Sequence, residues 1–446
     1  MTFHDASHGA LPPDPFPEED DGLSCGPGRG SGTVRAFEIE RVRGRRVWDS
    51  RGRPTVEAEV HLAGGATGRA IAPAGASTGS GEALDRRDGG QAFGGLDVMQ
   101  AVAAVEGEIA AALRGASVED QEALDALLIR LDGTEDKSRL GANASVAVSM
   151  AAAWAAANAA GMPLWRRLAG EGTVSLPAPE IQIFGGGAHA GRRVDIQDFM
   201  VTAPGAASFA EACAWTAEVY RTAGLLMAEA GRLRGVADEG GFWPDFDTNE
   251  AALDMLARAI ERAGFRAGEQ VAIALDVAAS EFGRDGRYRL ALEDRELDSE
   301  GMGALVGGWL ARYPVVSVED PLGEDDWEGF AAFTAEHGDR VEVVGDDLLV
   351  TSARRVAEAA RRGAANTLLI KPNQRGTLTE AKAAWDAARQ AGFGGIVSAR
   401  SGETEDVTIV HLAVGWRAPG LKVGSFARSE RMAKWNEAIR IEESLA

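Results

Sequence analysis

Alternating hydrophobic and polar positions near the beginning of the chain predict a small antiparallel sheet. The segment TVEAEVHL (55–62) places an apolar side chain at every second residue, which is the period of a half-buried strand. Three alanine-rich segments follow, whose composition favours helices; they span residues 97–114, 118–131 and 142–159. Together these elements predict an N-terminal α+β domain over residues 36–170.

The second half of the chain repeats one design. An apolar run of strand length ends in an ionisable residue, and a helical segment leads to the next run. The runs end at Asp276, Glu319, Asp346, Lys371, Arg400 and Lys422. Most of the gaps are close to the roughly 30 residues of one βα unit. A parallel α/β barrel produces this pattern, because its functional groups gather at the C-terminal ends of the strands. We therefore expect a TIM-type barrel over residues 171–446.

Three of these strand ends carry acids. Each acid alone is explained more simply as a helix N-cap or a solvated loop charge, and only the series favours a shared site. Asp276, Glu319 and Asp346 would then place three carboxylates on one rim of the barrel. An all-oxygen set of this kind suits a hard divalent cation, with Mg²⁺ favoured.

Two lysines and one arginine fall on the same predicted rim. A bound cation and a second cationic side chain lower the pKa of a lysine, so Lys371 and Lys422 are candidates for a neutral amine base near neutral pH. Arg400 offers a planar fork for a carboxylate or a phosphate. This set suits abstraction of a proton next to a carboxylate, with the metal holding the doubly charged enediolate.

Beyond these single residues, long segments of the chain resemble the enolase family from about Phe37 to Leu445. The resemblance rests on segments that occur in the enolase order: VWDSRGRPTVEAEV (47–60), APAGASTGSGEA (72–83), LGANASVAVSMAAA (140–153), ADEGGFWP (237–244), IALDVAASEF (273–282), VSVEDPLGEDDW (316–327), IKPNQRGTLTE (370–380), SGETED (401–406) and ARSERMAKWNE (427–437). It implies an enolase-like TIM-type barrel with a smaller N-terminal α+β domain. It also implies two Mg²⁺ ions per active site and a homodimer or higher homo-oligomer.

The resemblance implies a role for each candidate site residue. Lys371 would take the proton from C2, and Lys422 would bind the substrate carboxylate beside the metal. Glu239 would help the C3 hydroxyl leave, with Asp198 as its partner. The implied substrate-binding residues are His189, Gln197, Ala399, Arg400 and Ser401. The implied metal ligands are Asp276, Glu319, Asp346 and Ser77. Ser77 would close over the substrate and join a second Mg²⁺, although its glycine-rich segment taken alone indicates only a flexible loop.

Two of these positions depart from the family pattern. Ala399 stands where the family has a histidine in its SHRSGETED segment, which removes a donor beside the phosphate and opens volume. Asp198 stands where the family has glutamate, so its carboxylate reaches one methylene less far. The residues for proton abstraction are thus retained, while the leaving-group and phosphate side is altered.

Three functions are compatible with this set of residues. We expect a specialised paralogue that keeps the enolate chemistry on a larger phosphoryl or phosphonyl carboxylate, as carboxyphosphonoenolpyruvate synthase does, because Ala399 opens space. The first alternative is ordinary phosphopyruvate hydratase activity, which converts 2-phosphoglycerate to phosphoenolpyruvate and water. The second is a catalytically weak scaffold that binds a partner, against which the retained buried charges speak.

Composition and charge limit the classes of partner and the cellular compartment that we expect. The 446 residues include 46 Lys or Arg and 68 Asp or Glu, and the net charge of −22 argues against nucleic acid and anionic membranes as partners. Cys25 and Cys213 are too few for a disulfide framework and indicate a reducing compartment. Because no secretory signal is visible at the N-terminus, we expect a cytoplasmic protein.

Two segments need no chemical role. The uncharged run from Gly141 to Trp165 is dominated by alanine and predicts a buried helix rather than a membrane span. Residues 1–35 combine proline, glycine and acids with few large apolar groups, and this composition predicts a disordered tail.

Overall fold

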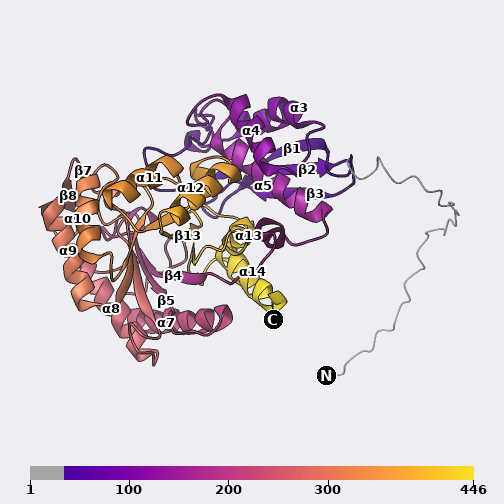
Figure 1. The fold of residues 1–446 in the computed structure, drawn as a ribbon. Coiled ribbons are helices and arrows are strands. Elements are labelled where there is room, and N and C mark those ends of the chain that lie inside the picture. The colour runs from indigo at the N-terminus through magenta and orange to yellow at the C-terminus, as the bar shows by residue number, and fades with distance from the viewer. Residues whose placement is uncertain (1–34, 446) are drawn as a thin grey trace, which may run out of the picture.

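The computed structural model describes residues 35–445, and Figure 1 shows their path from an N-terminal domain into a barrel. The predicted tail over residues 1–35 therefore lies outside the described residues, apart from Arg35.

An antiparallel sheet begins the described chain, as the alternating pattern predicted. Its strands are β1 (Ile39–Trp48), β2 (Pro54–Leu62) and β3 (Thr67–Ile71), in the order β1-β2-β3. Helix α5 (Ala142–Ala159) packs on β2 and β3. The approach is so close that a Cβ on Gly68 would lie 2.1 Å from the carbonyl oxygen of Ala151. The sheet therefore buries its apolar face against the alanine-rich helix.

Helices make up most of the rest of this domain. They are η1 (Ala92–Gly95), α2 (Met99–Ala104), η2 (Val105–Ile109), α3 (Ala110–Leu113), α4 (Gln121–Asp132), α5 and α6 (Leu164–Ala169). The three predicted helical segments are confirmed, and the first is divided by the π-helical turn η2. Helix α5 is buried along most of its length, which confirms the buried helix expected from the uncharged run. None of the helices within residues 35–445 has both the length and the hydropathy that crossing a membrane requires.

Eight strands close into the barrel expected for the second half. They are β4 (Ala178–Gly185), β5 (Asp198–Thr202), β6 (Ala272–Asp276), β10 (Val315–Glu319), β11 (Glu342–Gly345), β12 (Thr367–Ile370), β13 (Gly394–Ser398) and β14 (Gly420–Gly424). Their order around the barrel is β10-β11-β12-β13-β14-β4-β5-β6. The predicted fold class, a TIM-type barrel with a smaller N-terminal α+β domain, is confirmed.

The strands of the predicted series, from β6 onward, are parallel, but the barrel is not parallel at every strand. Strand β5 runs antiparallel to both of its neighbours, β4 and β6. The connection from β4 to β5 contains only the short helix η3 (Gly187–Ala190). A parallel partner needs a crossover of a dozen or more residues, usually with an α-helix, whereas a direct return gives an antiparallel pair.

Helices surround the barrel, as Figure 1 shows. They are α7 (Phe209–Glu229), α8 (Asn249–Arg262), α9 (Ser299–Arg312), α10 (Trp327–His337), α11 (Ala353–Arg362), α12 (Leu378–Gln390), α13 (Thr408–Gly415) and α14 (Ser429–Leu445). Shorter elements lie in the loops: η4 (Ala279–Glu281), η5 (Pro372–Gln374) and the meander β7 (Gly283–Arg284), β8 (Arg287–Leu290) and β9 (Arg295–Asp298).

The N-terminal domain contacts the rim of the barrel at which the predicted site lies. Ala74 and Gly402 exchange two backbone hydrogen bonds of 2.9 Å, which join the loop after β3 to the loop after β13. Lys137 of the N-terminal domain also pairs with Glu380 at the start of α12, at 3.0 Å. The loop over residues 72–83 is thereby held against the carboxyl ends of the barrel strands.

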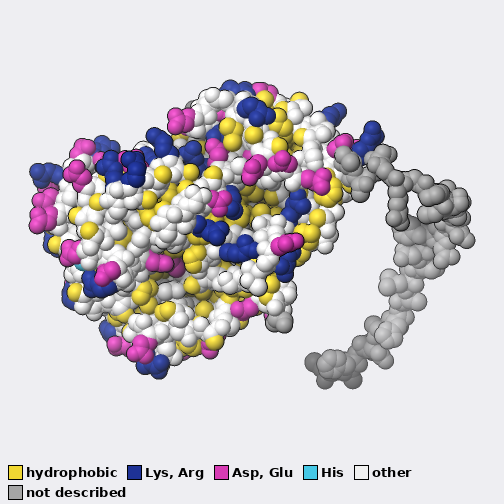
Figure 2. Space-filling view, in the orientation of Figure 1, with side chains coloured by type: hydrophobic (Ala, Val, Ile, Leu, Met, Phe, Trp, Pro, Cys, Tyr) yellow, Lys and Arg dark blue, Asp and Glu magenta, His cyan; other side chains and the backbone are white. Residues whose placement is uncertain are grey.

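Charged side chains of both signs are interspersed over the face of the molecule drawn in Figure 2. On this face the net charge of −22 therefore does not gather into a single acidic surface. An anionic ligand would have to meet a local group of cations.

Candidate active site

Three neighbouring strands bring the predicted carboxylates together. Asp276 is the last residue of β6, Glu319 is the last residue of β10, and Asp346 follows β11 directly. Glu319 and Asp276 are paired in register between their strands. All three side chains are buried. The parallel arrangement of β6, β10 and β11 thus places the three carboxylates on one rim of the barrel. Among the described residues, the groups of acids and histidines whose ligand atoms all lie within 4.8 Å of one another do not include this trio, so its role as a metal site stays a prediction.

Lys422 compensates two of these carboxylates from across the barrel. Its Nζ lies 2.8 Å from Asp276 Oδ2 and 2.7 Å from Glu319 Oε2. The same atom lies 3.5 Å from Asp198 Oδ2. Burial alone would lower the pKa of Lys422, but the surrounding carboxylates raise it well above its usual range.

Lys371 compensates the third carboxylate. It follows β12, and its Nζ lies 2.5 Å from Asp346 Oδ2. Burial lowers the pKa of Lys371, yet the charge of Asp346 outweighs burial and raises it. Each amine contacts a carboxylate directly, and an opposite charge at this distance favours the charged form. The predicted lowering of a lysine pKa depends on a bound cation beside the amines, and it stays a prediction.

The carboxylate set has oxygen atoms that remain free for a cation. Glu319 Oε1 and Gln197 Oε1 are buried without a hydrogen-bond partner. Gln197 Nε2 donates to Asp276 Oδ2 at 3.0 Å, which places the free amide oxygen beside the same group. Burial and the charges of Asp276 and Asp346 raise the pKa of Glu319 well above its usual range. Free oxygen atoms among buried carboxylates are what a divalent cation with oxygen ligands requires, so the residues fit Mg²⁺.

A second acidic group lies beside the first. Asp320, Asp346 and Asp347 each offer an oxygen within 4.8 Å of the others. The two carboxylate oxygens of Asp320 accept the backbone N–H groups of Asp346 and Asp347 at 3.0 and 2.7 Å. This carboxylate therefore fixes the turn that presents Asp346, and Asp346 is the member that also belongs to the first group.

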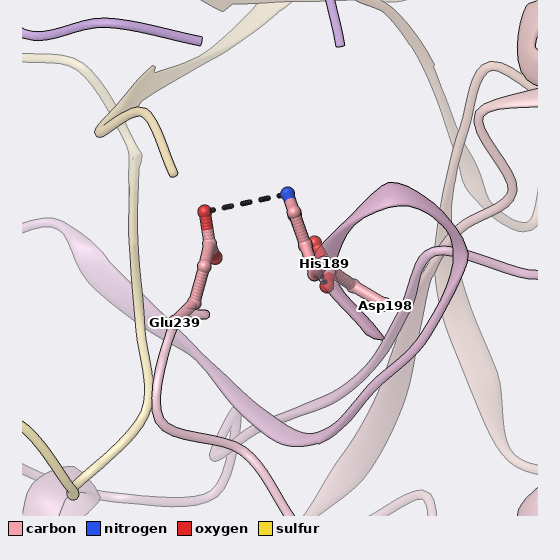
Figure 3. A group of neighbouring side chains, drawn as sticks. All are labelled: His189, Asp198 and Glu239. Atoms are coloured by element: carbon pink, nitrogen blue, oxygen red, sulfur yellow. Dashed lines mark hydrogen bonds and ion pairs between the residues drawn. The ribbon is translucent and has the colours of Figure 1, made fainter. Parts of the chain in front are cut away.

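His189 lies between two acids, as Figure 3 shows. Its Nδ1 is 3.0 Å from Asp198 Oδ1, and its Nε2 is 3.7 Å from Glu239 Oε1. Gln182 donates to Asp198 and, at 3.4 Å, to Glu239 Oε2. Asp198 was expected to act as a partner of Glu239, and the structure joins the two acids only through His189 and Gln182.

The two acids determine the charge of this histidine. Burial by itself lowers the pKa of His189, but Asp198 and Glu239 raise it to about 9. In turn His189 outweighs the effect of burial on Asp198 and lowers the pKa of that carboxyl to about 2. At neutral pH the group is therefore an imidazolium held between two carboxylates.

Arg400 and Ser401 follow β13 on the opposite side of the rim. Arg400 pairs with Glu82 at 2.9 Å and donates to the backbone oxygen of Ser77 at 2.9 Å. The hydroxyl of Ser401 accepts a hydrogen bond of 3.2 Å from Arg51. A guanidinium and a hydroxyl, both buried and facing the loop of Ser77, form a suitable place for a phosphate.

Most of the predicted residues line one cavity of about 20 Å³, which is room for about one water molecule. The predicted residues that line it are Ser77, His189, Gln197, Asp198, Glu239, Asp276, Lys371, Ala399, Arg400, Ser401 and Lys422. Glu319 and Asp346 adjoin it through their contacts with the two lysines. Ala399 lines this small cavity together with Ser77 of the loop over residues 72–83.

Three further residues belong to this network and are not among the residues predicted for the site. Gln182 lies within β4, Glu82 ends the loop over the site, and Gln374 lies in η5. All three are buried and hydrogen-bonded to predicted site residues. A buried polar side chain is informative, but burial becomes visible only when the fold is known.

The fold and the site together define a class of barrel enzyme. The active site of this class combines buried lysines with carboxylates that can hold a divalent cation. The chain matches the family model described as "Enolase, N-terminal domain" over residues 39–168 and the one described as "Enolase, C-terminal TIM barrel domain" over residues 173–446. It is 51% identical over 409 residues to the enolase of Rubrobacter xylanophilus, with 92% of this chain and 95% of that protein covered. The chain therefore belongs to the enolase family, and it is a lyase of that family that acts on a small phosphorylated carboxylate.

Proposed function

We propose that the protein is an ordinary phosphopyruvate hydratase, which converts 2-phosphoglycerate to phosphoenolpyruvate and water. The observation that carries the proposal is the complete set of three buried carboxylates and two buried lysines at one rim of the barrel. The enolase of Rubrobacter xylanophilus, which is 51% identical, supports the same assignment.

Proton abstraction would fall to Lys371, which would remove the proton from C2 as the neutral amine. Lys422 would bind the substrate carboxylate, since its Nζ already contacts carboxylate oxygens at 2.7 and 2.8 Å. Asp276, Glu319 and Asp346 would hold one Mg²⁺ and Ser77 would join a second, and the ions would supply positive charge for the carboxylate as negative charge accumulates on it. When substrate binds, it would replace the contacts between the lysines and the carboxylates. Loss of these contacts would also lower the pKa of Lys371 toward the value that a base needs.

Loss of the C3 hydroxyl would fall to Glu239. His189 lies 3.7 Å from this carboxylate and is held by Asp198, so it would orient Glu239 and balance its charge. Arg400 and Ser401 would hold the phosphate, and Gln197 would contact the substrate beside the metal ligands. The departures from the family pattern leave each of these groups in reach of the same cavity.

The specialised reading, with a larger phosphonyl substrate, rests on Ala399 and Asp198. The 51% identity to the enolase of Rubrobacter xylanophilus over 92% of this chain favours the ordinary reaction. A binding scaffold without catalysis has no evident need for five mutually dependent buried charges. A homodimer, which the family resemblance implies, completes the proposal, and sedimentation analysis of the purified protein tests it. The low cysteine content supports a reducing compartment, the cytoplasm.

A specificity comparison tests the proposal. The values of kcat/KM are measured for 2-phosphoglycerate and for a phosphonyl analogue that carries a larger group, with Mg²⁺ in both cases. We expect the protein to prefer 2-phosphoglycerate by at least about tenfold, which corresponds to about 1.4 kcal/mol of differential transition-state binding. A preference for the larger analogue would overturn the proposal and support the specialised paralogue.

A further inference from the structure

Glu82 lies near the end of the loop over residues 72–83, which covers the site. Its side chain reaches back into the site. Its carboxylate is buried and pairs with Arg400 through two hydrogen bonds, from Nη1 at 2.9 Å and from Nη2 at 3.1 Å. The backbone N–H of Gly79 donates to the same carboxylate at 3.1 Å. The acid thus joins the closed loop to the arginine that faces it.

This contact determines the direction of the Arg400 guanidinium. Nη1 also donates to Asn373 Oδ1 at 3.2 Å, and Nη2 also donates to the backbone oxygen of Ser77 at 2.9 Å. The four hydrogens on the two Nη atoms therefore all have protein acceptors, and only the Nε hydrogen remains for a ligand. A guanidinium held in this way has one orientation, and Glu82 supplies two of the four contacts.

Gln374 continues the connection to the other side of the site. Its Nε2 donates to Glu82 Oε1 at 3.2 Å and to Asp346 Oδ1 at 2.9 Å, so both amide hydrogens are used. Its Oε1 accepts a hydrogen bond of 2.6 Å from Thr351, whose hydroxyl also accepts the backbone N–H of Lys371 at 2.9 Å. Gln374 is fully buried, so water does not compete for these contacts.

A continuous path of side chains therefore runs from the phosphate side of the site to the base. It passes through Arg400, Glu82, Gln374, Asp346 and Lys371. Glu82 is the only member of this path that lies on the loop over residues 72–83. The path can form as observed only when that loop is closed, because the Glu82 carboxylate must reach both Arg400 and Gln374.

We propose that Glu82 is a positioning residue that couples closure of the loop to the alignment of Arg400 and, through Gln374, of the Asp346–Lys371 pair. The inference rests on the proposed function, since it assumes that Lys371 removes the C2 proton and that Arg400 holds the phosphate. Glu82 touches neither substrate nor reacting atoms in this account. It fixes the two groups that do, and a displacement of about 1 Å in such groups costs up to about a hundredfold in rate.

Two isosteric substitutions, E82Q and Q374M, test the coupling. Each single variant should lower kcat for 2-phosphoglycerate at least about tenfold, and exchange of the C2 proton with solvent deuterium should fall in proportion. Because both act on one path, the double variant should be no more than about twofold slower than the slower single variant. Effects that multiply in the double variant would show that the residues act independently and would overturn the proposal.

A binding measurement separates positioning from a merely structural role. The affinity for inorganic phosphate, measured by calorimetry in the presence of Mg²⁺, should stay within about threefold of wild type or increase in E82Q. The reason is that Arg400 keeps its charge and its contacts with Asn373 and Ser77 while a nearby negative charge is removed. A loss of phosphate affinity parallel to the loss of kcat would show general disruption of the site and would overturn the proposal.

Glu380 supplies the matched control. It is a half-buried glutamate that pairs with Lys137 between the same two domains but contacts none of the residues on the path. E380Q should keep kcat and phosphate affinity within about twofold of wild type. Should E82Q or Q374M fail to fold, E82D retains the charge with a shorter reach and should show the same loss of kcat with unchanged phosphate affinity. Wild-type protein without turnover of 2-phosphoglycerate would refute the proposed function, whereas additive effects in an active enzyme refute only the role of Glu82.

Discussion

Replacement of Lys422 by methionine should destabilise the protein strongly when no divalent cation is present and much less when Mg²⁺ is added. Lys422 is the only described cation in contact with both Asp276 and Glu319, at 2.8 and 2.7 Å. Methionine keeps most of the volume of the lysine stem and removes its charge. The variant therefore leaves two buried carboxylates uncompensated unless a cation binds between them.

The magnitude follows from the burial of this group. Removal of one partner from a buried ion pair costs about 3–5 kcal/mol in the free energy of unfolding. A chain of 446 residues has an unfolding entropy of about 0.9 kcal/mol/K. The thermal midpoint in EDTA should therefore fall by about 3–5 °C. Mg²⁺ reduces this difference only as far as the variant binds it more tightly than wild type, because binding with equal affinity stabilises both proteins equally. Without the competing ammonium group, K422M should bind Mg²⁺ about thirtyfold more tightly, which corresponds to about 2 kcal/mol.

The assay is thermal unfolding of wild type and K422M, each in EDTA and in Mg²⁺. The difference in midpoint between the two proteins should shrink by at least about half on addition of Mg²⁺. K434M is the matched control, because Lys434 is equally buried and pairs with Glu403 at 2.9 Å, outside the carboxylate set. The difference in thermal midpoint between K434M and wild type should be the same in EDTA and in Mg²⁺. An equal difference in both conditions for K422M would refute the assignment of Asp276 and Glu319 as cation ligands.

Three further predictions follow from the same geometry. K371A should lower the rate at which the C2 proton exchanges with solvent deuterium by at least about a thousandfold, yet leave Mg²⁺ binding in place. Exchange at the wild-type rate would exclude Lys371 as the base. A399H adds a charge-assisted donor beside the phosphate and should raise kcat/KM for 2-phosphoglycerate by about tenfold, and an unchanged value would show that Ala399 does not determine specificity. Protonated His189, with its pKa raised from 6.5 to about 9, contributes stability that is complete below about pH 6.5 and is lost as the pH rises through about 9. H189Q should therefore remove the decline of the thermal midpoint between these pH values, and an unchanged decline would assign it to another group.

The residues at strand ends were accessible to sequence analysis because a parallel barrel places them on one rim. Asp276 and Glu319 lie far apart in the chain, yet both contact Lys422 in the structure, as the repeating pattern predicted. The barrel direction at β5 was not accessible in the same way. Strand β5 follows a glycine-rich loop rather than a helix, so the pattern of βα units does not include it.

Charge states and side-chain networks required the three-dimensional contacts. The pKa of Lys371 is raised because Asp346 Oδ2 lies 2.5 Å from its Nζ, whereas the sequence placed the two residues on one rim without showing that they form an ion pair. Glu82 and Gln374 are 292 positions apart, and although each lies a few residues from a predicted site residue, their hydrogen bond becomes visible only in the folded chain. Whether Ala399 opens space for a larger substrate stays a prediction, since the cavity that it lines has room for only about one water molecule.

Formation of phosphoenolpyruvate from 2-phosphoglycerate tests the central claim most directly. The absorbance of the enolpyruvate product is followed with Mg²⁺, beside a control in EDTA. Our account predicts turnover of at least about ten per second with Mg²⁺, the typical value for an enzyme, and none in EDTA. Folded protein that binds Mg²⁺ and gives no phosphoenolpyruvate would contradict it.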